Sequence, residues 1–201
     1  MKQLIALATL AAATLAPTLA HAGLDSDNPV HPLVVIAITG GGDKLSEIEY
    51  TDGTSKSVTA GGLVQFYGGV EYHEKGSPFG FQATIGYHVD SANARNGQQK
   101  FERYPLELIA LFNATPKLRI GVGARYAMGA KFSSDGAGYV GNGDFKSQLG
   151  GLVMGEWLIT PSMGLQVRYV HETFKLEGAG TNGSDIDVDG SHGGIGFNYY
   201  F

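Results

Sequence analysis

The sequence predicts an all-β protein, an eight-stranded antiparallel up-and-down transmembrane β-barrel, and three observations carry this prediction. Apolar and polar side chains alternate along eight segments, which is the two-residue period of strands with one apolar face. Between these segments, short links alternate with longer polar links, as in barrels that cross a membrane. The last alternating segment ends the chain on an aromatic residue, Phe201.

The composition of the 201 residues suits a single exported domain. Glycine is abundant, at 31 residues, cysteine is absent, and the net charge is −5. Helical membrane proteins show runs of about 20 apolar residues, and this profile differs from theirs. The negative charge argues against a nucleic-acid partner.

The amino terminus has the pattern of a secretory signal peptide. Lys2 supplies a basic start, residues 4–15 are apolar, and Ala20 and Ala22 flank one residue in a small-x-small cleavage site. Cleavage is expected after Ala22. The expected organisation is therefore a signal peptide at 1–22, a polar periplasmic lead-in at 23–32 and the barrel domain at 33–201.

The expected strands occupy residues 33–50, 57–73, 79–90, 101–113, 118–132, 145–159, 163–177 and 190–201. The strand at 118–132 alternates most clearly, with Ile120 and Val122 on its apolar face and Arg119 and Arg125 on the other. Each strand is long enough for the roughly 9–11 residues that cross a bilayer at a tilt.

Three features interrupt or bound the predicted strands. Glycines 40–42 lie in the first strand, where they could mark a bulge, a kink or a true break. Asp52-Gly53 is a strong turn signal. Pro105 weakens the fourth strand, because proline cannot donate a ladder hydrogen bond.

The links predict which end of the barrel is which. The short links, each with one proline, are 75–78, 114–117 and 160–162, and the long polar links are 91–100, 133–144 and 178–189. Membrane barrels have short periplasmic turns and longer outer loops, and the carboxyl end falls on the short-turn side. A soluble barrel with its apolar face inward is the structural alternative; the signal peptide, the terminal aromatic residue and the many glycines favour the membrane barrel.

With these features, residues 33–201 resemble the small eight-stranded bacterial outer-membrane proteins, such as OmpX, OmpW and the OmpA transmembrane domain. The likeness is one of architecture. It implies a monomer in the Gram-negative cell envelope, exported through the periplasm, with outer-membrane lipid, lipopolysaccharide and the barrel assembly machinery as partners. Phe197, Tyr199 and Phe201 are then expected to be the assembly signal that the terminal strand presents.

His171 and Thr173 are a candidate catalytic pair. They share the lipid-side face of one strand, and the run from Tyr169 to Thr173 resembles the Tyr-x-His-x-Ser segment of outer-membrane lipid A deacylases. A hydroxyl beside a general base is suited to acyl transfer. The run departs from that segment because threonine replaces serine and no partnering acid is evident.

Asp185, Asp187 and Asp189, followed by Gly190, match the opening of a calcium loop. Gly196 stands where that loop needs a bidentate glutamate, and the same residues also alternate as a strand extending above the membrane. No cofactor is expected, and the histidines lack metal-ligand spacing: His31, His73, His88 and His192.

The inward-facing charges predict a plugged lumen. The expected ionic network consists of Glu71, Asp90, Arg103, Glu107, Arg119, Arg125, Lys131, Glu156, Arg168 and Glu172. Acids and bases balance, and an eight-stranded interior is just wide enough for side chains to fill, whereas a selective pore would carry a ring of one sign. The inward glycines argue the other way, since they leave room for water: Gly69, Gly86, Gly121, Gly123, Gly150, Gly194 and Gly196.

The expected function is that of a small, porin-like but non-enzymatic outer-membrane barrel, with a plugged lumen and a role in membrane integrity or surface interaction. The alternatives are a lipid A-modifying hydrolase and a narrow small-solute pore. Fold alone does not choose among them.

Overall fold

The computed structural model describes residues 23–50, 52–136, 139–176 and 184–201, and the regular elements there are all strands. They are β1 (Val30–Gly41), β2 (Lys44–Glu49), β3 (Ser55–Thr59), β4 (Leu63–Tyr72), β5 (Phe79–Ala94), β6 (Gly97–Asn113), β7 (Leu118–Gly136), β8 (Gly143–Ser147), β9 (Gly150–Thr160), β10 (Met163–His171), β11 (Thr173–Leu176), β12 (Ile186–Asp189) and β13 (His192–Tyr200). Nowhere in the described part is there a helix long and apolar enough to span a membrane.

Eight strands form a closed antiparallel barrel. The order runs β1, β4, β5, β6, β7, β9, β10 and β13, and β13 pairs back onto β1. The predicted fold is therefore confirmed. The proposed signal peptide, residues 1–22, lies outside the described residues.

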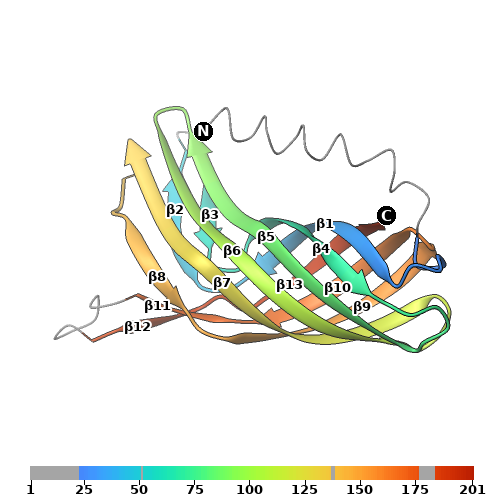
Figure 1. Ribbon diagram of the computed structural model, residues 1–201. Coiled ribbons are helices and arrows are strands. Elements are labelled where there is room, and N and C mark those ends of the chain that lie inside the picture. The colour runs from blue at the N-terminus through green and yellow to red at the C-terminus, as the bar shows by residue number, and fades with distance from the viewer. Residues whose placement is uncertain (1–22, 51, 137–138, 177–183) are drawn as a thin grey trace, which may run out of the picture.

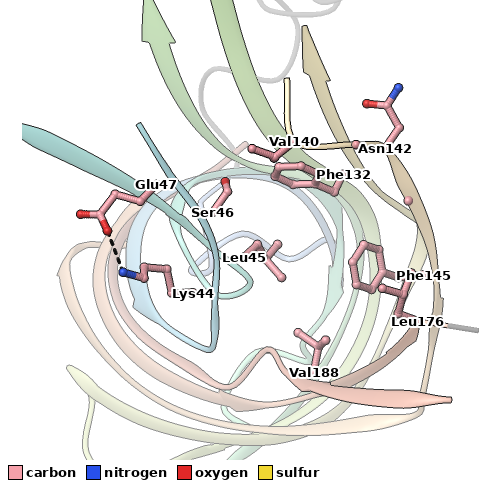
Figure 2. A pocket seen from close by; sticks show the side chains of 12 residues that line it. Lys44, Leu45, Ser46, Glu47, Phe132, Val140, Asn142, Phe145, Leu176 and Val188 are labelled. Atoms are coloured by element: carbon pink, nitrogen blue, oxygen red, sulfur yellow. Dashed lines mark hydrogen bonds and ion pairs between the residues drawn. The ribbon is translucent and has the colours of Figure 1, made fainter. Parts of the chain in front are cut away.

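The two ends of the barrel differ (Figure 1). At one end, here called the short-turn end, lie the tight links and the carboxyl terminus. At the other, the loop end, β5, β6 and β7 run on past the barrel, and β8, β11 and β12 continue their sheet. The β2–β3 hairpin also lies at the loop end, across the barrel mouth (Figure 2).

Several predicted strands are broken where they leave the barrel. Gly41 and Gly42 have φ angles of +134° and +75°, which favour glycine, so the triple glycine is a true break between β1 and β2. The predicted strand 57–73 likewise splits into β3 and β4. The Asp52-Gly53 turn is confirmed: it closes the hairpin, with Gly53 at a φ of +83° and Asp52 Oδ1 accepting from the Thr54 N–H at 2.9 Å.

The barrel wall is apolar outside and polar inside. On the outer face, Val122 is 56% exposed and Leu108 is 60% exposed, whereas Arg119 and Arg125 on the inner face are each 1% exposed. A soluble barrel would need the opposite arrangement. The alternation predicted for the strands is confirmed.

A bulge in β7 overturns one assignment. Gly129 has a φ of +60°, and two residues of β7 oppose one of β6 at this point. A bulge of this kind reverses the faces of the residues that follow. Phe132 is therefore buried, while Lys131 is exposed and lies 3.9 Å from Asp144. The predicted inward position of Lys131 is wrong.

Two further details of the barrel wall concern the pairing near Pro105 and the start of β1. The pairing of β5 with β6 skips residues 104 and 105, although it keeps its register, because Pro105 lacks an N–H to donate. β1 begins at Val30, so the expected lead-in 23–32 is too long by three residues. Leu24 before it packs with Leu33 and Tyr200 beneath the short-turn end.

The outward row of β7 generates a prediction about bilayer folding. Val122→Arg should make folding into lipid vesicles less favourable by about 2–4 kcal/mol, because it places a charge near the bilayer midplane. Ala114→Arg, in an exposed short turn, is the matched control and should change little. Urea titration of both variants in phospholipid vesicles measures the difference, and an unaffected Val122→Arg would contradict the assigned lipid face.

Candidate functional site

Arg125 is the centre of a charged network that crosses the lumen. Its Nε donates to Glu172 Oε2 at 2.8 Å, and its Nη1 donates to Glu107 Oε1 at 2.7 Å. Glu107 also accepts from Arg168 Nη2, at 2.7 Å to each of its oxygens. The Tyr67 hydroxyl lies 2.5 Å from Arg125 Nη1. β4, β6, β7 and β10 each contribute one of these side chains, and Glu172, the second acid, lies between β10 and β11. The network therefore joins strands from opposite sides of the barrel.

A histidine pair continues this network toward the loop end. His88, His192 and Glu172 offer ligand atoms within 4.8 Å of one another, which is close enough for a metal site. However, Arg103 and Arg125 place guanidinium nitrogens 3.2 and 3.1 Å from the two ring nitrogens of His88. A bound cation would meet these two positive charges, so the geometry suits holding arginines and not a metal.

A second network fills the short-turn end. Arg119 pairs with Glu71, and its Nη1 lies 3.3 Å from Glu156 Oε2. Glu156 Oε1 also accepts from the Tyr200 hydroxyl at 2.7 Å and from Asn198 Nδ2 at 2.6 Å. Multiple hydrogen bonds of this kind make buried charges tolerable.

Eight of the ten residues expected in the lumen lie in these two networks. They are Arg103, Arg119, Arg125, Arg168, Glu71, Glu107, Glu156 and Glu172, and all are buried. Lys131 lies outside, as described above. Asp90 is buried but accepts from Thr59 N and Oγ1, at 2.8 and 3.0 Å, so it anchors the hairpin. Four arginines therefore face four glutamates.

An apolar cap covers the networks at the loop end. Phe101 and Phe174 are fully buried and contact each other edge to face, with ring centroids 5.4 Å apart. Ile48 and Val58 of the β2–β3 hairpin pack in the same cluster. Arg103 lies directly beneath, with its guanidinium carbon 5.0 Å from the centroid of Phe101. The cap thus separates the charged lumen from the solution at the loop end.

Hydrogen bonds hold the hairpin in place. Asp43 N donates to Asp189 O at 2.7 Å, and Asp189 N donates to Asp43 Oδ2 at 2.8 Å. Thr39 Oγ1 donates to Gly61 O at 2.9 Å. The hairpin is joined in this way to β1 of the barrel wall and to β12 above the wall at the loop end.

The inward glycines do not provide the water-filled space that the sequence suggested. At Gly121, an added Cβ would lie 2.7 Å from Met154 and 2.9 Å from Leu111. At Gly86, the ring of Tyr67 occupies the corresponding position. These two glycines let large side chains of the adjacent strands pack over them.

His171 lies on the outer face, and its partner is not the expected one. Its Nδ1 lies 2.9 Å from Ser191 Oγ. The Ser191 N–H donates to Asp189 Oδ1 at 2.8 Å. His171 also borders a groove of about 500 Å³ on the outer wall, together with Val122, Val153 and other residues. The structure thus supplies a serine hydroxyl beside His171, where the sequence pointed to Thr173.

The three aspartates of the calcium-like run do not converge. β12 is an extended strand, so Asp187 and Asp189 follow its two-residue period along one face. Asp187 lies 3.9 Å from Lys175 Nζ, and Asp189 is used in the hairpin contact. In the conformation described, these side chains form the strand end that the sequence offered as the alternative.

The terminal strand β13 closes the barrel. Phe197 lies on the outer face, and Tyr199 and Phe201 stack edge to face with ring centroids 4.8 Å apart. The Phe201 N–H donates to Pro32 O at 2.9 Å. These aromatic residues lie at the short-turn rim, and their proposed role in assembly stays a prediction.

No protein-family model and no curated protein sequence matches the chain. Among solved structures, it resembles Neisserial surface protein A, with a TM-score of 0.51 and 15% identity over 87% of this chain and 98% of that one. The fold is that of the small eight-stranded outer-membrane barrels. Ail, the attachment invasion locus protein of Yersinia pestis, gives a TM-score of 0.50 and 15% identity, over 86% and 97%. OprG, an outer membrane protein of Pseudomonas aeruginosa, gives 0.43 and 15%, over 90% and 99%.

The central network generates a stability prediction. Glu107→Gln should lower the free energy of unfolding by about 3–5 kcal/mol, because Arg168 loses its buried carboxylate partner and Arg125 keeps only Glu172. Asp144→Asn is the control: it also removes one carboxylate, but from the exposed pair with Lys131, and should cost at most about 1 kcal/mol. Urea unfolding in vesicles measures the free energy of unfolding of both variants. Equal losses would show that the buried contacts of Glu107 stabilise the barrel no more than an exposed ion pair does.

Proposed function

We propose that this chain is a non-enzymatic outer-membrane barrel of a Gram-negative cell envelope that is closed to solutes and acts at its loop end. In this orientation the short-turn end faces the periplasm and the loop end faces the exterior. The apolar outer wall supports membrane insertion. The role is then in membrane integrity or in contacts with other surfaces, with lipid and lipopolysaccharide as neighbours.

The observation that carries the proposal is the double closure of the lumen. Arg125, Arg168 and Glu107 meet across its centre at 2.7 Å, and the apolar cap lies above them. Opening a solute path would require breaking several buried, charge-assisted hydrogen bonds and displacing the hairpin. These contacts therefore favour a closed barrel over a solute pore.

Planar-bilayer recording tests the closure. The folded monomer should give no reproducible single-channel steps. A triple variant, Glu107→Ala with Arg125→Ala and Arg168→Ala, removes the central bridging side chains but leaves the apolar cap in place, so it should also give no steps. Its gel mobility with and without heating reports folding. Stable steps from the unmodified protein would overturn the closed barrel and favour the pore.

A lipid hydrolase is the second candidate, and the contact of His171 with Ser191 supports it. In that reaction Ser191 Oγ would attack an ester carbonyl while His171 accepts its proton. The bond from the carbonyl carbon to the lipid oxygen would then break, and the lipid would leave as an alcohol with the proton from His171. Water would later hydrolyse the acyl-serine ester, release the fatty acid and restore the Ser191 hydroxyl. The acyl chain would lie in the outer-wall groove beside His171.

Fatty-acid release from lipopolysaccharide by the folded protein distinguishes the two candidates. The non-enzymatic proposal expects no release above that of a His171→Ala, Ser191→Ala double variant. Release that disappears in both single variants but persists in Thr173→Ala would establish the hydrolase with Ser191 as nucleophile.

A further inference from the structure

The segment 23–28, here called the strap, lies at the short-turn end of the barrel, ahead of β1 (Figure 1). The Leu24 N–H donates to Pro161 O at 3.0 Å, and Pro161 lies in the turn between β9 and β10. The Ser26 N–H donates to Gly23 O at 2.8 Å, so the strap contains a turn of its own. It therefore reaches from the start of β1 past β13 to the β9–β10 turn.

Leu24 is the apolar side chain that the strap buries. It is 5% exposed and belongs to one apolar cluster with Leu33 and Tyr200. The Tyr200 hydroxyl donates to Glu156 Oε1 at 2.7 Å, so its ring connects this cluster to the charged network of the short-turn end. Leu24 thus covers that network at the short-turn end, as the apolar cap covers the central network at the loop end.

Gly23 packs directly against the β9–β10 turn. It is buried, and a Cβ at this position would lie 2.5 Å from Ser162 Oγ and 2.8 Å from the carbonyl carbon of Pro161. Such distances are shorter than van der Waals contact, so a residue with a side chain would displace the strap or the turn. The docked position of the strap therefore depends on glycine.

The strap is held less firmly than the cap. Among the described residues, its hydrogen bonds to other parts of the barrel are that of Leu24 with Pro161 and that of Lys75 Nζ with Asp27 Oδ1, at 2.8 Å. The side chains of Lys75 and Asp27 are 61% and 92% exposed, and an exposed ion pair contributes little stability. The cap, by contrast, belongs to a larger cluster of buried residues. Elements with few buried contacts open before the rest of a protein.

We propose that the strap is a releasable seal that controls the access of water to the lumen from the short-turn end. When the strap detaches from Pro161, Leu24 leaves its cluster and water reaches Tyr200. Pro29 O still accepts from the His73 N–H, at 2.7 Å, and fixes the point from which the strap swings. The central network and the cap stay closed, so the released state is a vestibule open at one end. This inference goes beyond the proposed function, which places the activity at the loop end.

Hydrogen exchange of the folded protein in lipid nanodiscs tests the release without any substitution. The amides of Leu24 and Ser26 should be less protected than that of Ala60, which donates to Asp43 O at 2.9 Å in the hairpin. Raising the ionic strength should speed exchange in the strap about twofold to fivefold, because salt screens the exposed ion pair of Asp27. The exchange of Ala60 should not respond.

A substitution at Lys75 separates this ion pair from other effects of salt. Lys75→Gln should speed exchange in the strap by about the same twofold to fivefold and remove its response to salt. Lys44→Gln is the matched control, because it removes another exposed ion pair, with Glu47 at 2.7 Å in the hairpin. It should leave exchange in the strap unchanged.

A substitution at Gly23 tests the seal itself. Gly23→Val should speed exchange in the strap about tenfold or more, because the added side chain overlaps the β9–β10 turn. Gly68→Val is the matched control, since a Cβ at Gly68 has no atom within 4 Å. With 3-fluorotyrosine labelling, the fluorine signal of Tyr200 should shift between light and heavy water in Gly23→Val alone, whereas that of Tyr67, in the central network, should shift in neither variant.

Two results would overturn the proposal. The first is protection of Leu24 and Ser26 as great as that of Ala60 in the unmodified protein, which needs no variant to fold and shows that the strap does not open separately. The second is a Gly23→Val protein in which Tyr200 stays dry, or in which Tyr67 and Tyr200 become wet together, since the barrel then opens as a whole or the strap is no seal.

Discussion

The burial of four guanidinium groups inside a narrow barrel is the constraint on which the rest of the structure depends. Arg103, Arg119 and Arg125 are among the most deeply buried large side chains of the chain. An unpaired charge at such a site costs several kcal/mol, so each arginine requires carboxylates held at a fixed place on another strand. The register of the strands and the pairing of the charges therefore support each other, since shifting one strand would turn its charged groups to the lipid face.

The hairpin across the loop end follows from the same constraint. Ion pairs lose strength where water reaches them, and Arg103 lies at the upper edge of the network, directly below Phe101 and Phe174. The β2–β3 hairpin brings Ile48 and Val58 onto these rings. This position explains why the chain breaks at Gly41–Gly42: a continuous strand would carry these apolar residues upward and away from the mouth.

Much of the barrel could be predicted from the sequence, because the two-residue period is a local property. The eight-stranded wall, the outward row of β7 and the paired lumen charges follow from it. The position of Lys131 could not be predicted, because the bulge at Gly129 depends on the pairing with β6. The hairpin cap and the contact of His88 with His192 were missed as well, since they join segments far apart in the chain and have no spacing signal.

The inward glycines show how pattern and packing diverge. From the sequence, Gly86 and Gly121 were counted as empty space for water. In the structure Tyr67 packs over Gly86, and Leu111 and Met154, from the two adjacent strands, pack over Gly121. Tyr67 thereby brings its hydroxyl to Arg125. Small residues on one strand thus make room for the large polar and apolar groups of the next, and the lumen is filled because of its glycines. The described interior is thus packed with paired charges and large side chains, which the small residues of the wall accommodate.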